Sequence, residues 1–309
     1  MMGMLCSRSD KEISMRGLLM SSGVAAMLII AGGLSTAKPL AEDKTYDLRG
    51  PAPTKGQVFV SKMTLKIKDA DTTLKIMGMN LKLKMTMNVI GEEEQKVLAV
   101  DGRNVTKCQS KITKERAEIT TDFGGMNQAM TQPTELEGEI VISERVEGNK
   151  WKHSLVDTKP TEKQKKELDN RNGIENEDDL YPAEKVKVGH TWKVEAKALT
   201  KLFGNSFTDI KGELNQKFVK VEEVEGEECA LVESEGTVKG KMKDDDGMPT
   251  LDVEMELKVK SWRSLKTGVE LKGKFEGKIK LAGKQKIDDA AVDITLSGPL
   301  SGESATKLK

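Results

Sequence analysis

The feature that most constrains the fold is a strict alternation of apolar and polar residues. In "MGMNLKLKMTMNV", Met77–Val89, every odd-numbered position is apolar and every even-numbered one is Gly, Asn, Lys or Thr. Successive side chains of a β-strand point to opposite faces, so this period predicts a strand with one dry and one wet face. A strand of this length spans about 43 Å and is expected to twist, which makes its apolar face concave.

Later segments repeat the alternation. "LDVEMELKV" (Leu251–Val259) and "VELKGKFEGKIKL" (Val269–Leu281) place apolar residues on one face, and the opposite face is almost entirely Lys and Glu. This arrangement is typical of antiparallel sheet with one solvated face. We therefore predict a mainly β protein whose long antiparallel strands form curved sheets, a half-barrel or a barrel.

Local signals predict where the strands end. Turns are expected at residues 91–92, 101–102 and 225–226, and a register change near Lys62. The stretch "FGGMNQAMTQPTE" (123–135) contains two glycines and a proline and is predicted to be a loop. One helix is expected over residues 158–172, with a capping box in "TEKQ" at 161–164.

The predicted organisation has six parts, and its two β sections either form two similar sheets or fuse into one. The parts are a signal peptide (1–37), a flexible linker (38–56), an N-terminal β section (57–157), a helix with connector (158–182), a C-terminal β section (183–300) and a tail (301–309).

The N-terminus predicts export. Arg8, Lys11 and Arg16 precede the apolar run "GLLMSSGVAAMLIIAGGL" (17–34), and small residues follow before Lys38. This is the order of a secretory signal peptide, so we expect a periplasmic or secreted protein. An uncleaved N-terminal anchor is the alternative, and it would be the chain's contact with a membrane.

Composition argues against several classes of function. Lys plus Arg and Asp plus Glu both number 50, so the chain lacks the basic field that attracts nucleic acid. Two Tyr and three Trp are too few for the aromatic girdles of an outer-membrane barrel. There is no P-loop, no G-x-S-x-G and no H-E-x-x-H. We expect no enzymatic activity, cofactor or metal, and a hydrolase built on His153 or His190 is a weaker alternative.

The methionines of the first stretch allow two interpretations. M-x-M spacing places thioethers on one face of a strand, where they could bind Cu(I), but no polar or His ligand lies close in sequence. Flexible methionines also fill irregular cores or line apolar binding grooves. The candidate ligand-binding residues on this apolar face are Met77, Met79, Leu81, Leu83, Met85, Met87, Met255 and Phe275.

Two cysteines follow the leader. Cys108 and Cys229 could form one disulfide in an oxidising compartment, or remain as two buried free thiols on strands.

A short motif resembles a known group of proteins. "YPAEKVKVGHTW" contains Pro182, Val186, Val188, Gly189 and Trp192 in the pattern P-x(3)-V-x-V-G-x-x-W. It resembles a motif of secreted bacterial β-rich proteins of unknown function, over about 120 residues from Tyr181 toward Leu300, with His190 where those proteins usually have Asp. The resemblance implies architecture and no activity. Physically, the glycine permits a tight turn and the tryptophan anchors the returning chain.

Together these patterns predict a non-catalytic envelope protein that binds a lipid or another hydrophobic ligand on a concave apolar face. The alternative is a structural or protein-interaction module with a filled core and an exposed uncharged patch at residues 123–135.

Overall fold

The computed structural model describes residues 44–76, 78–147, 150–203, 207–242, 251–287 and 290–309. The leader (1–37) and Met77 lie outside the described residues. The strands are β1 (Val58–Ile76), β2 (Met79–Asp101), β3 (Asn104–Phe123), β4 (Met126–Pro133), β5 (Ile140–Val146), β6 (Lys150–Leu155), β7 (Thr191–Glu195), β8 (Phe207–Val224), β9 (Glu227–Met242), β10 (Leu251–Ser264), β11 (Glu270–Ile287) and β12 (Ala290–Leu308).

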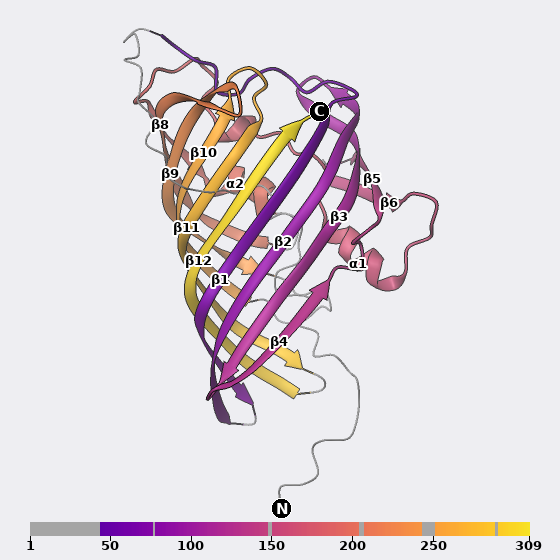
Figure 1. Cartoon of the computed structure of the whole chain (residues 1–309), viewed down its shortest axis with the longest axis vertical. Helices are drawn as coiled ribbons and strands as arrows, with labels where there is room; N and C mark the ends of the chain where they lie inside the picture. Colours follow the sequence, from indigo (N-terminus) through magenta and orange to yellow (C-terminus); the bar gives the residue numbers. More distant parts are fainter. Residues whose placement is uncertain (1–43, 77, 148–149, 204–206, 243–250, 288–289) are drawn as a thin grey trace, which may run out of the picture.

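All the strands belong to one curved, antiparallel sheet (Figure 1). Its order is β6-β5-β3-β2-β1-β12-β11-β10-β9-β8-β7, and β4 pairs with β3 beside this path. Because the first strand pairs with the last, the two predicted β sections are fused into one sheet. In the described part the end strands β6 and β7 do not pair with each other, so the sheet is an open half-barrel. The prediction of a mainly β, curved antiparallel fold is confirmed.

The strands are longer than several of the sequence signals indicate. β2 runs through Gly91 without interruption, so the turn predicted at 91–92 is wrong. Gly91 has an ordinary extended backbone, whereas the glycines at 102 and 226 have positive φ and form the two turns that were predicted correctly.

The predicted loop at 123–135 is also wrong. Gly124 and Gly125, both with positive φ, make a tight turn, and the amide-rich residues after them form β4. The sequence did not indicate this strand, because amide side chains and glycines are typical of turns.

The register change in β1 lies further along than expected. The irregularity is between Ile67 and Ala70, not near Lys62. Asp69 adopts a positive φ there, and its backbone N–H donates to Thr86 Oγ1 at 3.0 Å. The bulge shifts the inward face from odd to even residue numbers while keeping the strand in the sheet.

Two helices accompany the sheet. α1 (Glu162–Asn170) lies within the predicted helix and begins with the expected capping box between Thr161 and Gln164. α2 (Ala196–Phe203) was not predicted, and it packs mainly against β8. Within the described residues, neither helix is long and apolar enough to cross a membrane.

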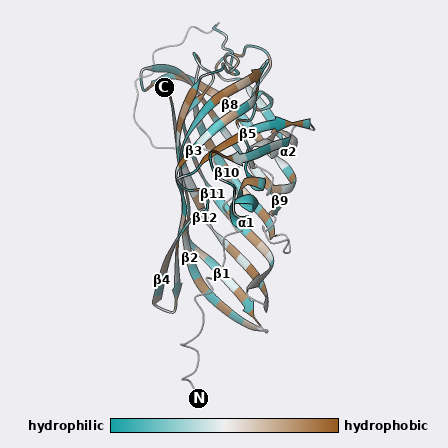
Figure 2. Cartoon of the chain, turned by 90° about the vertical axis from the view of Figure 1, so that its right-hand side faces the viewer, coloured by the Kyte–Doolittle hydropathy of each residue, from teal (hydrophilic) through white to brown (hydrophobic). Residues whose placement is uncertain are grey.

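Two inner segments, residues 44–50 and 178–190, fill part of the concave side together with α2. They are joined by an isolated bridge between Tyr46 and Val186. Tyr46 packs edge-on against Phe218 of β8, and Leu199 of α2 is fully buried. The main core therefore lies between these segments and the apolar inward residues of the sheet. Figure 2 shows the hydropathy alternating along the strands.

Candidate functional site

The predicted apolar face is divided into a filled part and an open part. Met85 and Met87 are buried in the main core, as are Met255 and Phe275 from the opposite wall. Leu81 and Leu83 are half-buried, and Met79 is 70% exposed. The face is thus packed in the middle of the half-barrel and uncovered toward its lower end in Figure 1.

Neighbouring strands extend the uncovered part. On β1, Leu74 and Ile76 stand opposite Leu81 and Met79 and are half-buried. On β3, Phe123 is on the same face as the buried Ile119 and is paired with Met126 of β4. Phe123 is 42% exposed and Met126 is 69% exposed.

We call this set the lower apolar surface. It consists of Leu74, Ile76, Met79, Leu81, Leu83, Phe123 and Met126. The residues from β3 and β4 were not among the predicted site residues, although M-x(3)-M in "MNQAM" carries the same period-two signal as the first stretch.

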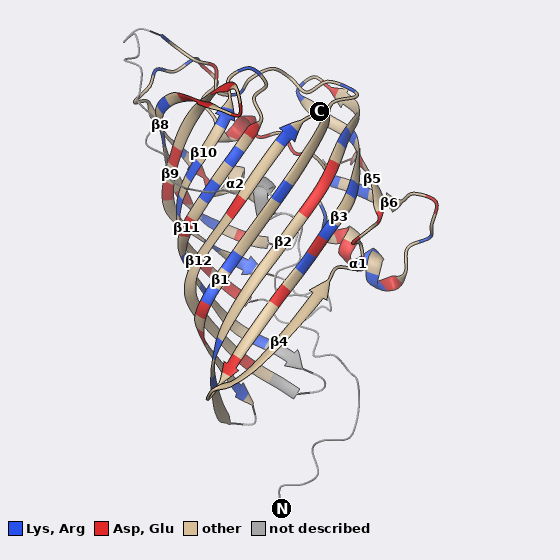
Figure 3. Cartoon of the chain, viewed as in Figure 1, with Lys and Arg blue, Asp and Glu red and all other residues tan. Residues whose placement is uncertain are grey.

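The convex face of the sheet has the opposite character. Lys side chains pair with Asp and Glu across strands there, with Lys84 Nζ 2.6 Å from Asp71 Oδ1 and Lys260 Nζ 2.6 Å from Glu233 Oε1 (Figure 3). Such exposed pairs contribute about 0–1 kcal/mol each. A convex hollow of about 650 Å³ across β7 to β11 is lined largely by these charged residues, so this face does not suit an apolar ligand.

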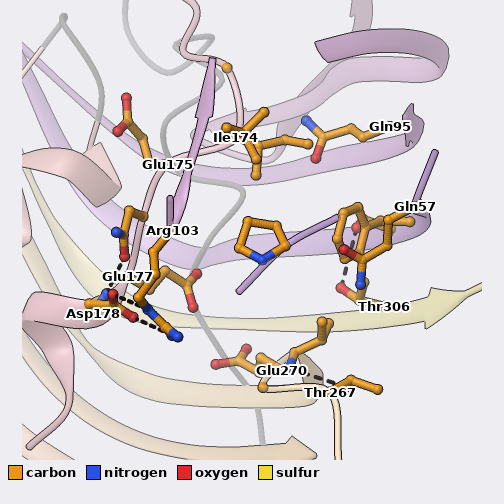
Figure 4. Close-up of a pocket in the computed structure, with 18 of the residues that line it drawn as sticks. Gln57, Gln95, Arg103, Ile174, Glu175, Glu177, Asp178, Thr267, Glu270 and Thr306 are labelled. Carbon is orange, nitrogen blue, oxygen red and sulfur yellow. Dashed lines mark hydrogen bonds and ion pairs between the residues drawn. The ribbon is translucent and has the colours of Figure 1, made fainter. Parts of the chain in front are cut away.

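Inward positions become partly polar toward the upper end. Along β12 they change from Leu300 to Ser304 and Thr306, and along β1 the polar Ser61 lies between the apolar Met63 and Phe59. Ser61, Ser304 and Thr306, with Glu93 and Gln95 of β2, belong to the sheet wall of a pocket of about 270 Å³ (Figure 4). We call it the upper pocket, and residues 49–57 and 171–178 form its other wall.

Arginine–carboxylate pairs hold the second wall in place. Arg103 makes a two-pronged contact with Asp178, at 2.5 Å from Nε to Oδ2 and 2.8 Å from Nη2 to Oδ1. It also donates to the backbone carbonyl of Gly50. Burial raises the pKa of Asp178, but the hydrogen bonds and the charge of Arg103, with smaller contributions from Asn176 and Arg49, together outweigh burial and lower it. Asp178 is therefore ionised across the neutral range.

Arg263 of β10 fastens both inner segments to the sheet. Its Nε donates to the Leu48 carbonyl at 2.6 Å, and its Nη1 lies 2.8 Å from Glu177 Oε2. Its guanidinium also stacks over the Tyr181 ring, 4.1 Å from the centroid. The Leu48 contact spans 215 residues of sequence and the Glu177 contact 86, which is why no local motif indicates them.

Arg171 is a second buried arginine. Its Nη1 lies 2.7 Å from Glu115 Oε2 and its Nη2 lies 3.3 Å from Glu93 Oε2. Burial raises the pKa of Glu93, and the attraction to Arg171 opposes that rise.

Glu270 differs from the other carboxylates of the pocket. It is part-buried at the start of β11 and accepts a hydrogen bond from Ser304 Oγ at 3.3 Å. No ion pair joins it to any residue in the described part of the chain. Burial is the main cause that raises the pKa of Glu270 to about 8, and the negative charge of Glu177 is the second. At neutral pH its carboxyl is therefore mostly protonated.

The two histidines have structural surroundings. Ser143 Oγ and His153 Nδ1 are 2.8 Å apart, and His153 Nε2 donates to the Arg171 carbonyl at 3.0 Å. Burial lowers the pKa of His153 to about 4, so it is neutral. Ser143 is itself buried, so the hydrolase hypothesis has no accessible nucleophile at this position. His190 stacks on Trp192.

Cys108 and Cys229 are both free thiols in the structure, so the disulfide considered from the sequence is absent. They lie in separate apolar clusters, Cys108 with Val97 and Val105, and Cys229 with Trp262. Burial raises the pKa of Cys108, and it raises that of Cys229 to about 12. Low thiolate content makes both thiols poor nucleophiles. Across the described residues, no group of three or more His, Cys, Asp or Glu is arranged to hold a metal ion.

The motif residues build the connection that enters β7. Gly189 has φ 91° and donates its N–H to the Phe218 carbonyl. Trp192 Nε1 donates to the Leu180 carbonyl at 2.9 Å, and Val186 and Val188 pack in the main core. Pro182, half-buried, begins the segment. The glycine and tryptophan thus have the geometric roles expected from the sequence.

Comparison with known proteins gives little. No family model and no curated protein matches the sequence. Two solved structures align weakly. A DUF1329 family protein from Desulfovibrio piger is 8% identical over 83% of this chain and 86% of its own, with a TM-score of 0.16. The outer membrane protein OprG from Pseudomonas aeruginosa is 6% identical over 84% of this chain and 99% of its own, with a TM-score of 0.19. Similarities this low carry no functional information.

Proposed function

We propose that this is a non-catalytic protein of the cell envelope that binds a hydrophobic ligand, such as an acyl chain, on the lower apolar surface. The observation that supports the proposal is the exposure of Met79, Phe123 and Met126 on the concave face of an otherwise well-packed half-barrel. Large apolar side chains gathered on one exposed surface mark binding sites, whereas isolated ones are ordinary.

The chemistry of this surface suits a flexible apolar ligand. Methionine side chains adapt to irregular shapes, and Phe123 adds a flat contact. Each Å² of apolar surface removed from water contributes about 25 cal/mol, so an acyl chain laid along the strands would be held mainly by burial. Because the convex face is charged and solvated, the concave face is the one that suits an apolar ligand.

A matched pair of double variants tests the proposal. Met79→Lys with Met126→Lys is expected to weaken binding of a fluorescent C18 fatty acid at least about tenfold, because two charges would enter the apolar surface. Asn80→Lys with Asn127→Lys adds the same charge at neighbouring positions on the opposite face and is expected to bind normally. The measurement is a fluorescence titration of the purified protein. Equal affinities for the two double variants, or no binding by the wild type, would contradict the proposal.

The envelope location is part of the same proposal. It is supported by the basic, apolar and small-residue order of residues 8–37. N-terminal sequencing of the protein from the extracytoplasmic fraction is expected to begin at Lys38, whereas an intact leader would indicate the anchored alternative.

A specific observation also favours the second candidate, an interaction module. Among the described residues β4 pairs with β3 alone, and it contains no charged residue (Figure 3). The two end strands of the sheet carry lysines, Lys150 and Lys152 on β6 and Lys193 on β7. Charged residues on an edge strand oppose pairing with other chains. The unprotected β4 is therefore a suitable edge for strand pairing with a second copy of this chain.

Self-association provides its test. We expect the wild type to sediment as a dimer at micromolar concentration and the Ala129→Lys/Thr131→Lys variant as a monomer, because the paired strands would bring like charges together. Thr120→Lys on β3 is the control for added charge. A monomeric wild type would count against the interaction module and would leave the ligand proposal untouched.

A further inference from the structure

We propose that the upper pocket is a second binding site, which takes the ammonium group of a small organic cation against the carboxylate of Glu270. This inference is independent of the lower apolar surface. It rests on the shape of the pocket and on which of its charges already have partners.

The pocket has room for a small molecule and walls of two kinds. Its volume is about 270 Å³, and Figure 4 shows Glu270, Thr306 and Gln95 on the sheet wall. Ser61 and Ser304 add hydroxyl groups that can accept hydrogen bonds from an ammonium. The apolar side chains at the pocket include Phe59, Val105, Ile174 and Val269, which suit a short hydrocarbon stem.

The distribution of charge selects a cation. Three arginines at the pocket have carboxylate partners within 3.3 Å. Arg103 pairs with Asp178, and Arg263 pairs with Glu177. Arg171 pairs with both Glu115 and Glu93.

The two remaining arginines near the pocket also have acceptors, a neutral carbonyl for Arg49 and a carboxylate for Arg145. Arg49 donates from Nε and Nη2 to the Tyr181 carbonyl, and Arg145 pairs with Glu175 at 3.0 Å. Glu270 is left without an ion pair in the described part of the chain. Glu177, although paired with Arg263, is close enough to raise the pKa of Glu270 further. An anion would meet two carboxyl groups here, whereas a cation would supply the missing partner.

Protonation links the site to pH. Glu270 has a pKa of about 8, set by burial and by Glu177 and opposed by Arg263 and by hydrogen bonds from Ser304 and Ser261. An ammonium bound to the ionised carboxylate would displace this proton. Affinity is therefore expected to increase between pH 6 and about pH 8.5 and to level off above the pKa of Glu270.

Calorimetry with n-butylammonium chloride and with neutral n-butanol tests the site. At pH 8.5 we expect the ammonium to bind the mature protein at least about tenfold more tightly than the alcohol. At pH 7, titrations in two buffers of different ionisation enthalpy are expected to show release of close to one proton per site.

Glu270→Gln is expected to weaken ammonium binding at least about tenfold and to abolish proton release. Glu276→Gln, on the exposed face of the same strand, is the matched control and is expected to bind as the wild type does. Circular dichroism checks folding, and Glu270→Asp, which keeps the charge on a shorter stem, is expected to retain part of the affinity. Equal affinity for ammonium and alcohol, or unchanged binding by Glu270→Gln, would overturn the proposal, as would no binding by the wild type.

Discussion

Replacing Arg171 with Met is expected to lower the free energy of unfolding by about 3–5 kcal/mol at pH 7. Arg171 is buried and contacts Glu93 and Glu115 through separate guanidinium nitrogens. Met fills much of the same volume, so the loss comes from two carboxylates left in a dry environment without a cation. The pKa of Glu93 is already raised by burial while Arg171 is present, so it would rise further without it.

The pH dependence of this loss distinguishes charge from packing. A carboxyl whose pKa is raised in the folded state does not lower the free energy of unfolding at a pH below its unfolded pKa, because both states then hold the proton. Its cost appears as the pH rises above that value. The difference between wild type and Arg171→Met should therefore be largest at neutral pH and shrink toward pH 4.5. Urea unfolding followed by tryptophan fluorescence at both pH values measures it.

Arg116→Met is the control for this experiment. Arg116 pairs with Glu137 at a position much more open to solvent than Arg171. We expect its replacement to cost about 1 kcal/mol or less, because exposed ion pairs contribute little. If the two variants lost the same stability, or if the loss in Arg171→Met did not change with pH, the buried network would not have the role assigned to it.

The sequence was sufficient to predict the fold wherever local rules act alone. Alternation predicted curved antiparallel sheet, the glycines at 102 and 226 predicted tight hairpins, and Thr161 with Gln164 predicted the start of α1. It did not predict β4, whose amides and Pro133 also suit a loop. It did not predict α2 either, because this helix is held by packing on β8.

The upper pocket was missed for a different physical reason. The run "GEEEQK" at 91–96 resembles a solvated turn, yet Glu93 and Gln95 continue the inward parity of Met87 and Val89. The same holds for Ser304 and Thr306, which follow the inward Leu300. Continuing the alternation of inward and outward side chains past the last apolar residue of each strand would have placed these polar side chains on the inward face. The partner of Thr306 in this pocket, Ser61, is 245 residues away in the sequence and could not be assigned without the fold.

Replacing Gly277 with Ala is expected to cost about 3 kcal/mol, because there is no space for a methyl group. Gly277 lies in the middle of β11, between Leu257 of β10 and Leu300 of β12. A Cβ built there would meet the backbone carbonyl oxygen of Glu256 at 1.9 Å, so the two strands would have to separate. The structure identifies the neighbouring strand β10 as the element that approaches this glycine.

Gly91→Ala is the control variant for this prediction. Gly91 also lies within a long strand, at an extended backbone conformation, but a Cβ there would meet only Met63 Cε, at 3.8 Å. Gly91→Ala is expected to be neutral or to stabilise by about 0.5–1 kcal/mol, because alanine loses less backbone entropy on folding. In thermal unfolding, the midpoint of Gly277→Ala should therefore lie several degrees below that of the wild type, whereas the midpoint of Gly91→Ala should equal or exceed it. A Gly277→Ala protein as stable as Gly91→Ala would mean that β10 and β11 are not packed as tightly as this geometry requires, and that the half-barrel is less strongly curved there.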